Sequence, residues 1–581
     1  MSTAPSTTQM TWLQTQRERL RNADQGAFWL WGMIVLTALI VFPPILYLIE
    51  TSFTIQKTGQ QPYVGLANFT TVIDLSGWDL WRVTILYATG SSFIAIFVGV
   101  TSAWLVARTN AYMRQFAMIG AFLSLAAPVI IKGIGWILLL GPNKGVFNEW
   151  LRWLGMTGVP IELFSLGGMI FIEGLLWTPI CFLLTLPALT SMDPALEEAA
   201  ATSGARLSQT FLKVTLPLAM PSILAVLLLT FIRSLESFEV PLLIGSPGGL
   251  QTFTTAIYDV IHRGYIPRYG EASAYSVLLI AVVAIPLILY YRVTRDSQKY
   301  ATVTGKGFRP SRLDLGPWRI PAAIYLLIMP LSLIAPLTIM LWASFLPIYE
   351  PPQWSDLARM SLQNYKEVLV RPLTVDGMWN GTIVASISSC VVATFCFILA
   401  WMVVRRRESV KWMLDMIGSL PLVLPGIVLG IAVLIQFLHI RWIPIYGTIW
   451  IMVFAFLIRF LPYGIRFCYA GITSIHRELE ESARTSGART FTMLWRIVLP
   501  LALPAVAAIW IYVFLNSIRD LSLPVMLAGP QNQLIAIVIL ELWENGEVPE
   551  LGALSILLAV TVTILGYIFM RLSQRYGTRG F

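Results

Sequence analysis

One polar segment occurs twice in this chain, and the duplication constrains the fold more than any other feature of the sequence. Residues 189–221 read LTSMDPALEEAAATSGARLSQTFLKVTLPLAMP, and residues 472–504 read ITSIHRELEESARTSGARTFTMLWRIVLPLALP. The two segments align without a gap at an offset of 283 residues. Because long apolar segments flank both copies, we expect a membrane protein of two related halves, each with the same polar loop.

The composition is that of a polytopic membrane protein. Of the 581 residues, 56% are apolar and 12% are charged, and the mean hydropathy is +0.72. About twenty apolar residues cross a bilayer as a helix. We therefore predict an all-α membrane protein with about 12 transmembrane helices. The predicted spans cover about residues 28–49, 83–107, 115–140, 169–189, 216–238, 272–293, 320–345, 380–404, 412–438, 447–470, 499–519 and 551–572.

Orientation follows from the positions of Lys and Arg, which stay on the cytoplasmic side of bacterial membranes. Basic residues gather in the N-terminal tail and in segments 108–114, 292–319, 405–411 and 571–579. All of these lie on one side if both termini are cytoplasmic, which we predict. Both polar loops then face the cytosol. Since topology accounts for the net charge of +9, the charge gives no reason to expect a nucleic-acid partner.

Shorter matches extend the repeat beyond the loops. Residues 103–106 (AWLV) correspond to 400–403 (AWMV), and 264–267 (GYIP) correspond to 546–549 (GEVP). Each half thus carries six spans in the same order, and an even number of spans makes the halves parallel repeats. The predicted units are a cytoplasmic tail (1–27), a first six-span unit (28–293, polar loop 190–215), a cytoplasmic linker (294–319), a second unit (320–572, polar loop 472–498) and a cytoplasmic tail (573–581).

The first polar loop has the features of a short helix with a docking face. Asp193-Pro194 is a favourable helix start, and Glu197 and Glu198 fall in the first turn, where the helix dipole favours negative charge. Small residues follow, which let another surface approach closely. An interfacial helix that only stabilises the bundle is the alternative, but two copies with the same E-[AS]-A-x-x-x-G spacing favour docking. The residues of this pattern are Glu198, Ala199, Ala200 and Gly204 in one copy and Glu481, Ser482, Ala483 and Gly487 in the other.

This pattern, with the Leu-Pro pair that follows it, resembles the E-A-A-x-x-x-G loop in permeases of binding-protein-dependent ABC importers. The resemblance covers nearly the whole chain; Ser482 departs from the alanine of the pattern, one small residue for another. It implies an inner-membrane protein, surrounded by lipid, whose two loops dock onto two copies of a cytoplasmic ABC ATPase. A periplasmic solute-binding protein would deliver a small polar solute. The chain itself would be no enzyme and bind no cofactor, since ATP and Mg²⁺ belong to the ATPase; accordingly it lacks a GxxxxGK[ST] loop.

Charged side chains near the ends of two equivalent spans are candidates for the translocation path, because charge inside a membrane is costly and usually functional. Arg233, Glu236 and Glu239 end the fifth span, and Asn516, Arg519 and Asp520 end the eleventh. The alternative is that they cap helices at the membrane surface. Glu541, Glu544, Glu547 and Glu550 are interpreted as a solvated outer loop, with contact to a binding protein as the alternative.

The segments SMDPALEEAA and SLESFEVPLLIG, in a fused two-unit chain, resemble the branch that includes ferric-iron permeases. Related fused permeases carry thiamine or 2-aminoethylphosphonate, so ferric iron is the leading expectation and these solutes are alternatives. No spacing of His, Asp, Glu or Tyr indicates a metal site, and the four cysteines form no CxxC pair. Three other classes are alternatives: an ion-gradient-driven secondary transporter, an ABC exporter and a membrane enzyme. The duplicated loop argues against the first two, and the lack of a nucleophile elbow or paired histidines argues against the third.

Overall fold

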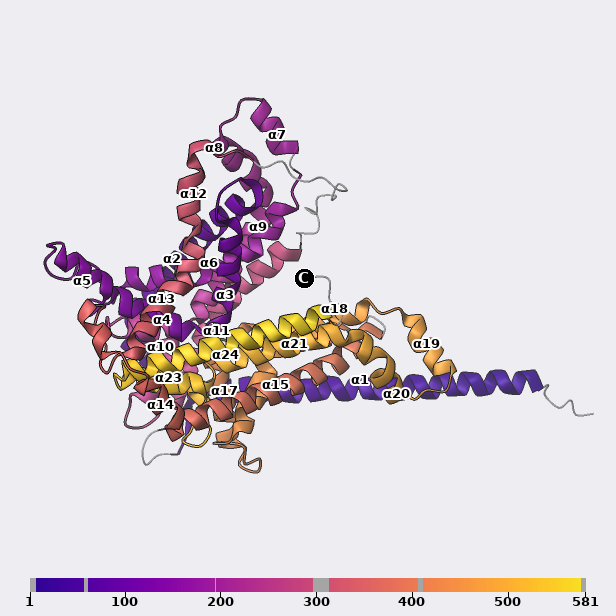
Figure 1. Ribbon diagram of the computed structural model, residues 1–581. Helices are drawn as coiled ribbons and strands as arrows, with labels where there is room; N and C mark the ends of the chain where they lie inside the picture. The colour runs from indigo at the N-terminus through magenta and orange to yellow at the C-terminus, as the bar shows by residue number, and fades with distance from the viewer. Residues whose placement is uncertain (1–6, 57–60, 194, 296–312, 406–410, 576–581) are drawn as a thin grey trace, which may run out of the picture.

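The computed structural model describes residues 7–56, 61–193, 195–295, 313–405 and 411–575. In this part of the chain the fold is helical except for one antiparallel pair of strands, β1 (Thr54–Ile55) and β2 (Tyr63–Val64) (Figure 1). Ten helices are long and apolar enough to cross a membrane, and two sharply bent pairs bring the number to twelve if each pair is one span. The predicted all-α fold with about twelve spans is therefore confirmed, whereas the cytoplasmic location of the termini stays a prediction.

The first half contains six candidate spans joined by short helices. The spans are α1 (Thr7–Phe53), α2 (Ala67–Arg108), the bent pair α3 (Arg114–Ala126) and α4 (Val129–Leu140), α6 (Leu166–Thr190), α9 (Leu216–Glu236) and α11 (Tyr269–Arg295). The short helices are α5 (Val146–Trp153), α7 (Ala195–Thr202), α8 (Leu207–Thr210) and α10 (Phe253–His262).

The second half repeats this order. Its spans are α12 (Arg319–Leu326) continuing into α13 (Ile328–Phe345), α15 (Pro372–Arg405), the bent pair α16 (Lys411–Ser419) and α17 (Gly426–His439), α18 (Ile449–Thr473), α21 (Leu499–Arg519) and α24 (Val548–Arg575). Its short helices are α14 (Gln363–Val370), α19 (Arg477–Thr485), α20 (Thr490–Met493), α22 (Pro524–Leu527) and α23 (Ile535–Glu544).

Two spans that we predicted as straight helices are broken. The segments 115–140 and 412–438 each turn sharply, by 113° between α3 and α4 and by 106° between α16 and α17. Pro128 and Pro425 stand at the breaks with extended backbone, at φ −56°, ψ 140° and φ −52°, ψ 148°. Proline has no N–H for a helical hydrogen bond and disfavours helical backbone in the residue before it. The two prolines therefore account for the breaks.

The fifth and eleventh spans begin before the Leu-Pro pairs at which we expected them to start. The continuous helices run over Ser208–Glu236 and Thr490–Arg519, with π-helical turns at Phe211–Thr215 and Leu494–Val498. Pro217 and Pro500 follow these turns and lack the N–H that an α-helix would use. A wide π-helical turn just before each proline lets the helix continue, so part of each predicted polar loop belongs to the next span.

The first span of each half packs against the other half. α13 contacts α3 and α4 of the first half, and α1 contacts α16 and α17 of the second. Two glycines allow the close approach of α13: a β-carbon on Gly120 or Gly135 would lie 2.6 Å or 2.5 Å from the nearest atom of Pro330 or Pro336. The halves are therefore joined through exchanged first spans.

The end of the linker also holds the second half onto the first. Leu313 N–H donates to the carbonyl of Arg108 over 2.9 Å, and the Asn110 side-chain amide donates to Asp314 over 2.8 Å. The Gly316 N–H, the Asn110 amide and the Arg319 guanidinium together lower the pKa of Asp314 to about 2. α12 consequently runs along the arm that contains α2, α6 and α9 (Figure 1). The linker residues 296–312 lie outside the described residues.

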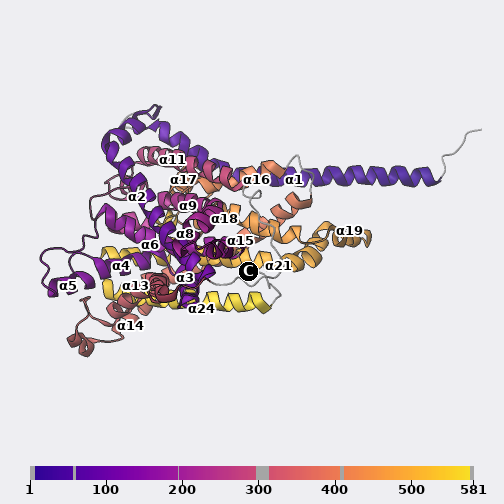
Figure 2. The same ribbon diagram turned by 90° about the horizontal axis from the view of Figure 1, so that it is seen from above.

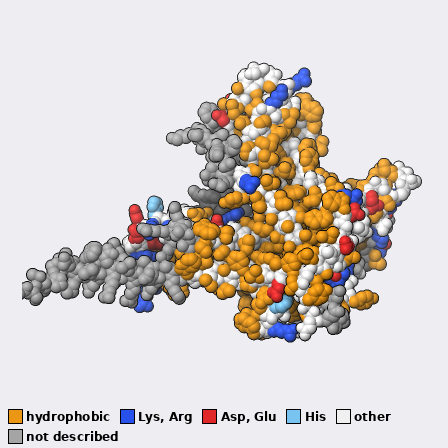
Figure 3. Space-filling model, turned by 180° about the vertical axis from the view of Figure 1, so that it is seen from behind, with side chains coloured by type: hydrophobic (Ala, Val, Ile, Leu, Met, Phe, Trp, Pro, Cys, Tyr) orange, Lys and Arg blue, Asp and Glu red, His pale blue; other side chains and the backbone are white. Residues whose placement is uncertain are grey.

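The two arms of the structure diverge from a common end. Figures 1 and 2 show α5 and α14 at the end where the arms meet, with α19 at the far end of one arm. α7 lies at the far end of the other arm (Figure 1). Hydrophobic side chains cover most of the face seen in Figure 3, and charged side chains gather at its edges. Exposed residues such as Phe93, Phe97 and Ile288 fit a lipid-facing surface.

The contact of α13 with α4 gives a stability prediction. Gly135→Ala should lower the midpoint of thermal unfolding of the purified chain, because the new methyl group collides with the backbone of Pro336 and such overpacking costs about 1–3 kcal/mol. Gly32→Ala is the control, since no atom lies within 4 Å of its added β-carbon. Equal midpoints for the two variants would show that the exchanged span is not tightly packed.

Candidate functional site

The duplicated loops fold as short helices, α7 and α19, which we call the coupling helices. The Asp193 carboxylate accepts the N–H of Ala195 over 2.9 Å, as predicted for a helix start, while Pro194 lies outside the described residues. Gly204 and Gly487 follow the helices with φ of 80° and 82°, a left-handed conformation that glycine adopts without strain. Ala205 and Ala488 then donate back to the carbonyls of Ala200 and Ala483 over 3.0 Å each. The glycine of the pattern is thus the residue that ends each coupling helix.

Most of the predicted docking residues are exposed. In α7 and the turn after it, Glu198, Ala199 and Gly204 are exposed and Ala200 is half-buried. In α19, Glu481, Ser482 and Gly487 are exposed, whereas Ala483 is buried against the rest of the molecule. α7 therefore presents small residues to solvent, whereas in α19 only Ser482 of the predicted Ser-Ala pair is exposed. The docking role of these residues stays a prediction.

Each coupling helix is held at its base by a buried ion pair, which we call its anchor pair. Arg108 at the end of α2 contacts Glu197 over 2.8 Å, and Arg405 at the end of α15 contacts Glu480 over 2.6 Å. The Arg108 and Glu197 side chains are 1% and 4% exposed. The same guanidinium groups also donate to the carbonyls of Met192 and Ile475, over 3.2 Å and 3.0 Å. The two halves thus use equivalent residues in the same geometry.

The remaining bonds of the two glutamates differ between the halves. The second oxygen of Glu197 accepts the Thr215 hydroxyl over 2.6 Å, whereas that of Glu480 accepts the Trp401 indole N–H over 3.2 Å. Both carboxylates are fully hydrogen-bonded, which a buried charge requires. Glu197 and Glu198 both lie in the first turn of α7, as predicted, but the Glu197 carboxylate also points inward and is paired with Arg108. The sequence signal for the anchor pairs is that an arginine and a glutamate recur at equivalent positions of the two repeats: Arg108 and Glu197, and Arg405 and Glu480.

A second group of charged residues lies where the first-half arm meets the second, at the ends of α9 and α21. Arg233 in α9 contacts Glu236 over 2.9 Å and donates to the Tyr463 hydroxyl in α18, so it reaches from the first half to the second. Arg519 in α21 donates to the backbone carbonyl of Leu125 in α3, so it reaches in the opposite direction. We call the residues at these ends the charged layer.

Among the described residues, the other predicted members of the charged layer make no bond across the interface. Asn516 and Asp520 have partners within their own half, and Glu239 has no charged partner in the part of the chain that the structure describes. Asn516 accepts from Arg519 over 2.7 Å. Asp520 is paired with Arg459 over 2.7 Å. Glu239 has no Lys, Arg or His within ion-pair distance among the described residues. Glu236 and Arg519, which align in the repeat, do not contact each other but bind separate partners.

Sequence reasoning missed three charged residues that belong to this region. Arg459 holds Asp520, and its guanidinium also donates to the Ser522 hydroxyl over 3.3 Å. Lys132 and Glu173 are 4% and 1% exposed; Lys132 donates to the Ser124 carbonyl over 2.9 Å, and Glu173 accepts from the Trp177 indole over 2.8 Å. All three lie inside predicted spans, so the rule on intramembrane charge that selected Arg233 applied to them equally.

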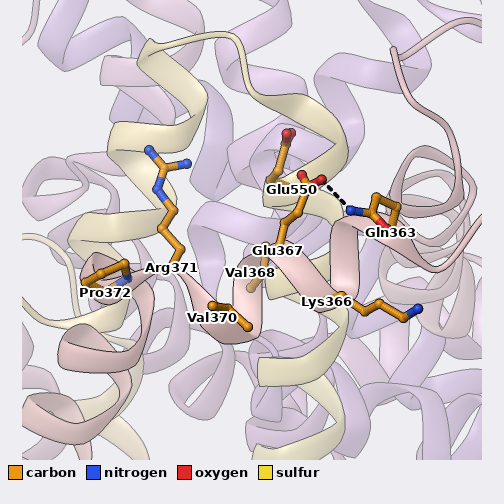
Figure 4. Close-up of a pocket in the computed structure, with 8 residues that line it drawn as sticks. All are labelled: Gln363, Lys366, Glu367, Val368, Val370, Arg371, Pro372 and Glu550. Carbon is orange, nitrogen blue, oxygen red and sulfur yellow. Dashed lines mark hydrogen bonds between the residues drawn. The ribbon is translucent and has the colours of Figure 1, made fainter.

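A cavity of about 540 Å³ opens on the second half and is separate from the charged layer (Figure 4). It is lined by α14, the start of α15 and Glu550 of α24, and Gln363 donates to Glu367 over 2.9 Å. Arg371 at its edge is paired with Glu547. All lining residues come from one half, so the cavity is no passage between halves. Across the described residues, no three His, Cys, Asp or Glu side chains form a group that could hold a metal ion.

Residues 95–297 and 391–579 each match the family model "Binding-protein-dependent transport system inner membrane component". A ferric transport system permease protein, FbpB, of Actinobacillus pleuropneumoniae is 28% identical over 490 residues, 82% of this chain and 69% of that protein. The probable ABC transporter permease protein y4fN of Sinorhizobium fredii is 24% identical and covers 96% of this chain and 98% of its own length. A bacterial alginate ABC transporter structure covers 51% of this chain at 22% identity and a TM-score of 0.37.

The anchor pairs give a prediction that separates the buried glutamates from their exposed neighbours. Glu197→Gln and Glu480→Gln should each loosen one coupling helix, because loss of one partner leaves a buried arginine uncompensated at a cost of about 3–5 kcal/mol. Limited proteolysis of the chain in detergent should then cut segments 190–215 or 472–498 faster than in the parent. Glu481→Gln is the control, since Glu481 is exposed and paired only with Arg477 at 3.3 Å. Equal cleavage rates in all variants would contradict an anchoring role.

Proposed function

This chain belongs to the family of binding-protein-dependent transport system inner membrane components, and we propose that it moves ferric iron into the cytoplasm, driven by two copies of an ABC ATPase. The chain is a multi-pass permease of an ABC importer with both membrane units fused. In the proposal, a periplasmic binding protein presents the iron and the ATPases supply the energy. ATP and Mg²⁺ are bound by the ATPases, and this chain binds no cofactor.

The presence of two equivalent, anchored coupling helices is the observation that carries the proposal. One permease chain with two docking helices accounts for two ATPase copies without a second permease subunit. The anchor pairs join each helix to α2 or α15, the long central span of its half. A push on a coupling helix would therefore reach the membrane through a rigid, buried contact rather than through a mobile loop.

The choice of solute rests on the relatives rather than on a metal site. FbpB of Actinobacillus pleuropneumoniae is named a ferric transport permease, and a second such protein of Haemophilus influenzae is 29% identical over 75% of this chain. Thiamine and 2-aminoethylphosphonate are the alternative solutes within the same machinery. The charged layer is the proposed path, because its residues lie where the halves meet and its two arginines cross between them.

A secondary transporter driven by an ion gradient is the second candidate class, favoured only by the parallel arrangement of two six-span units. The two classes differ in their energy source. Uptake that stops when ATP is depleted, with the ion gradient kept intact, supports the importer, and uptake that continues supports the alternative.

Docking is tested by the glycines that end the coupling helices. Gly204→Trp combined with Gly487→Trp should abolish co-purification of an ATPase with the tagged chain, because each adds a bulky side chain at an exposed, left-handed position beside the docking surface. The control is Gly447→Trp, which also has a positive φ, of 76°, but precedes α18 and is separated from α19 by the whole length of that span. An ATPase that co-purifies equally with all three proteins would contradict docking at these helices.

The path is tested by removing two carboxylates of the charged layer. Glu236→Gln and Asp520→Asn should each reduce uptake of ⁵⁵Fe-labelled ferric iron by at least about tenfold, since each removes the carboxylate that compensates the charge of a partly buried arginine. The ATPase should still co-purify, because both sites lie far from the coupling helices. Glu149→Gln, in an ion pair on α5, should leave uptake unchanged. Normal uptake by both path variants would remove the charged layer from the path.

A further inference from the structure

The break in the third span exposes backbone carbonyls inside the membrane region. The last carbonyls of any α-helix have no partner within the helix, and α3 ends at Ala126 just before Pro128, which has no N–H. Ser124 and Leu125 are in this last turn. In lipid such carbonyls need another donor, because no water is present to bind them.

Two cations supply the donors at the end of α3. Lys132, from α4 of the same half, donates to the Ser124 carbonyl over 2.9 Å. Arg519, from α21 of the other half, donates to the Leu125 carbonyl. Positive charge at a helix C-terminus also interacts favourably with the helix dipole. The end of α3 is therefore completed partly by its own half and partly by the other half.

Arg519 differs from the other arginines of the charged layer in the nature of its partners. Arg459 is paired with Asp520, and both belong to the second half, so their bond survives if the halves separate. Arg233 keeps Glu236 within α9 when its bond to Tyr463 is lost. In the part of the chain that the structure describes, Arg519 has no carboxylate within ion-pair distance, and its only other partner is the neutral Asn516. The hydrogen bonds of its guanidinium are therefore made to two neutral acceptors, one of which, the Leu125 carbonyl, lies across the interface.

The contacts of Arg233 and Arg519 with the opposite half lie where the two arms meet. α9 and α21 follow the coupling helices in the sequence and run from the diverging ends of the arms toward the common end (Figure 1). By the predicted topology this common end faces the outside, and the coupling helices face the cytosol. The structure thus has its arms closed outside and open inside.

We infer that Arg519 is a gating residue that closes the outer end of the path by capping the broken helix α3 of the opposite half. This inference rests on the proposed function. The contact exists only while the halves meet at the outer side, and it must break when they separate there. An interaction made in one state alone sets the balance between the two states. Arg519 would favour the state that is closed to the outside and so oppose leakage through the idle permease.

Accessibility of a thiol next to the charged layer tests the inference without any transported solute. Ser234 lies next to Arg233 in α9 and is 1% exposed. Ser234→Cys is placed in a Cys390→Ser background, which removes the exposed native thiol. Right-side-out spheroplasts are treated with the membrane-impermeant reagent MTSET, and the rate of modification is measured on the full chain together with its native partners.

The expected result is slow modification in this background and modification at least about tenfold faster when Arg519→Ala is added, because a hydrogen bond to a charged group is lost from the closed state only. Arg519→Lys should stay within about threefold of the background rate, since lysine can also cap a helix carbonyl. Arg371→Gln, which removes an outer ion pair within one half, is the matched control and should have no effect.

Equal rates with and without Arg519→Ala, at equal membrane content of the two proteins, would overturn the gating role. An increase of the same size in Arg371→Gln would overturn it as well, because the effect would then be a general loosening of the outer face. Neither result bears on the proposed importer function, which is decided separately by ATPase co-purification and ATP-dependent uptake.

Discussion

The buried pairing of an arginine at the end of a central span with a glutamate in the coupling helix is the contact on which the rest of the architecture depends. Arg108 with Glu197 and Arg405 with Glu480 have the same geometry in both halves and fix two otherwise exposed helices to the membrane bundle. A buried ion pair adds little net stability, but it tolerates one arrangement only, since separating the charges leaves both without compensation. This property suits the proposed role of the coupling helices in transmitting force.

Two further features join the halves. The first span of each half packs on the bent span of the other, and the linker end is bonded to α2 beside the first anchor pair. In the proposed transport cycle, the units that separate would be exchanged ones, in which α13 belongs with the first half and α1 with the second. The hydrogen bond between Asn110 and Asp314 holds the start of the second half on the first half, at the end of α2.

Much of this fold follows from the sequence, because its rules act locally. The sequence alone predicts the apolar spans, the gap-free repeat and the glycine after each coupling helix. The family matches confirm the two-unit permease. The direction of side chains was not readable: Glu197 and Glu198 are adjacent, yet only packing decides which one turns inward. The partners of Arg233 and Arg519 were equally hidden, because they lie in the opposite half, hundreds of residues away.

The central claim is that one chain holds two equivalent docks for an ATPase. Native mass spectrometry of the complex purified from its own membranes tests it most directly, since it counts subunits without assuming the solute. The account predicts a mass equal to one copy of this 64.9 kDa chain and two copies of a single ATPase. A complex with one ATPase copy would contradict it. So would purification of the chain without any ATPase, under conditions in which other importers keep theirs.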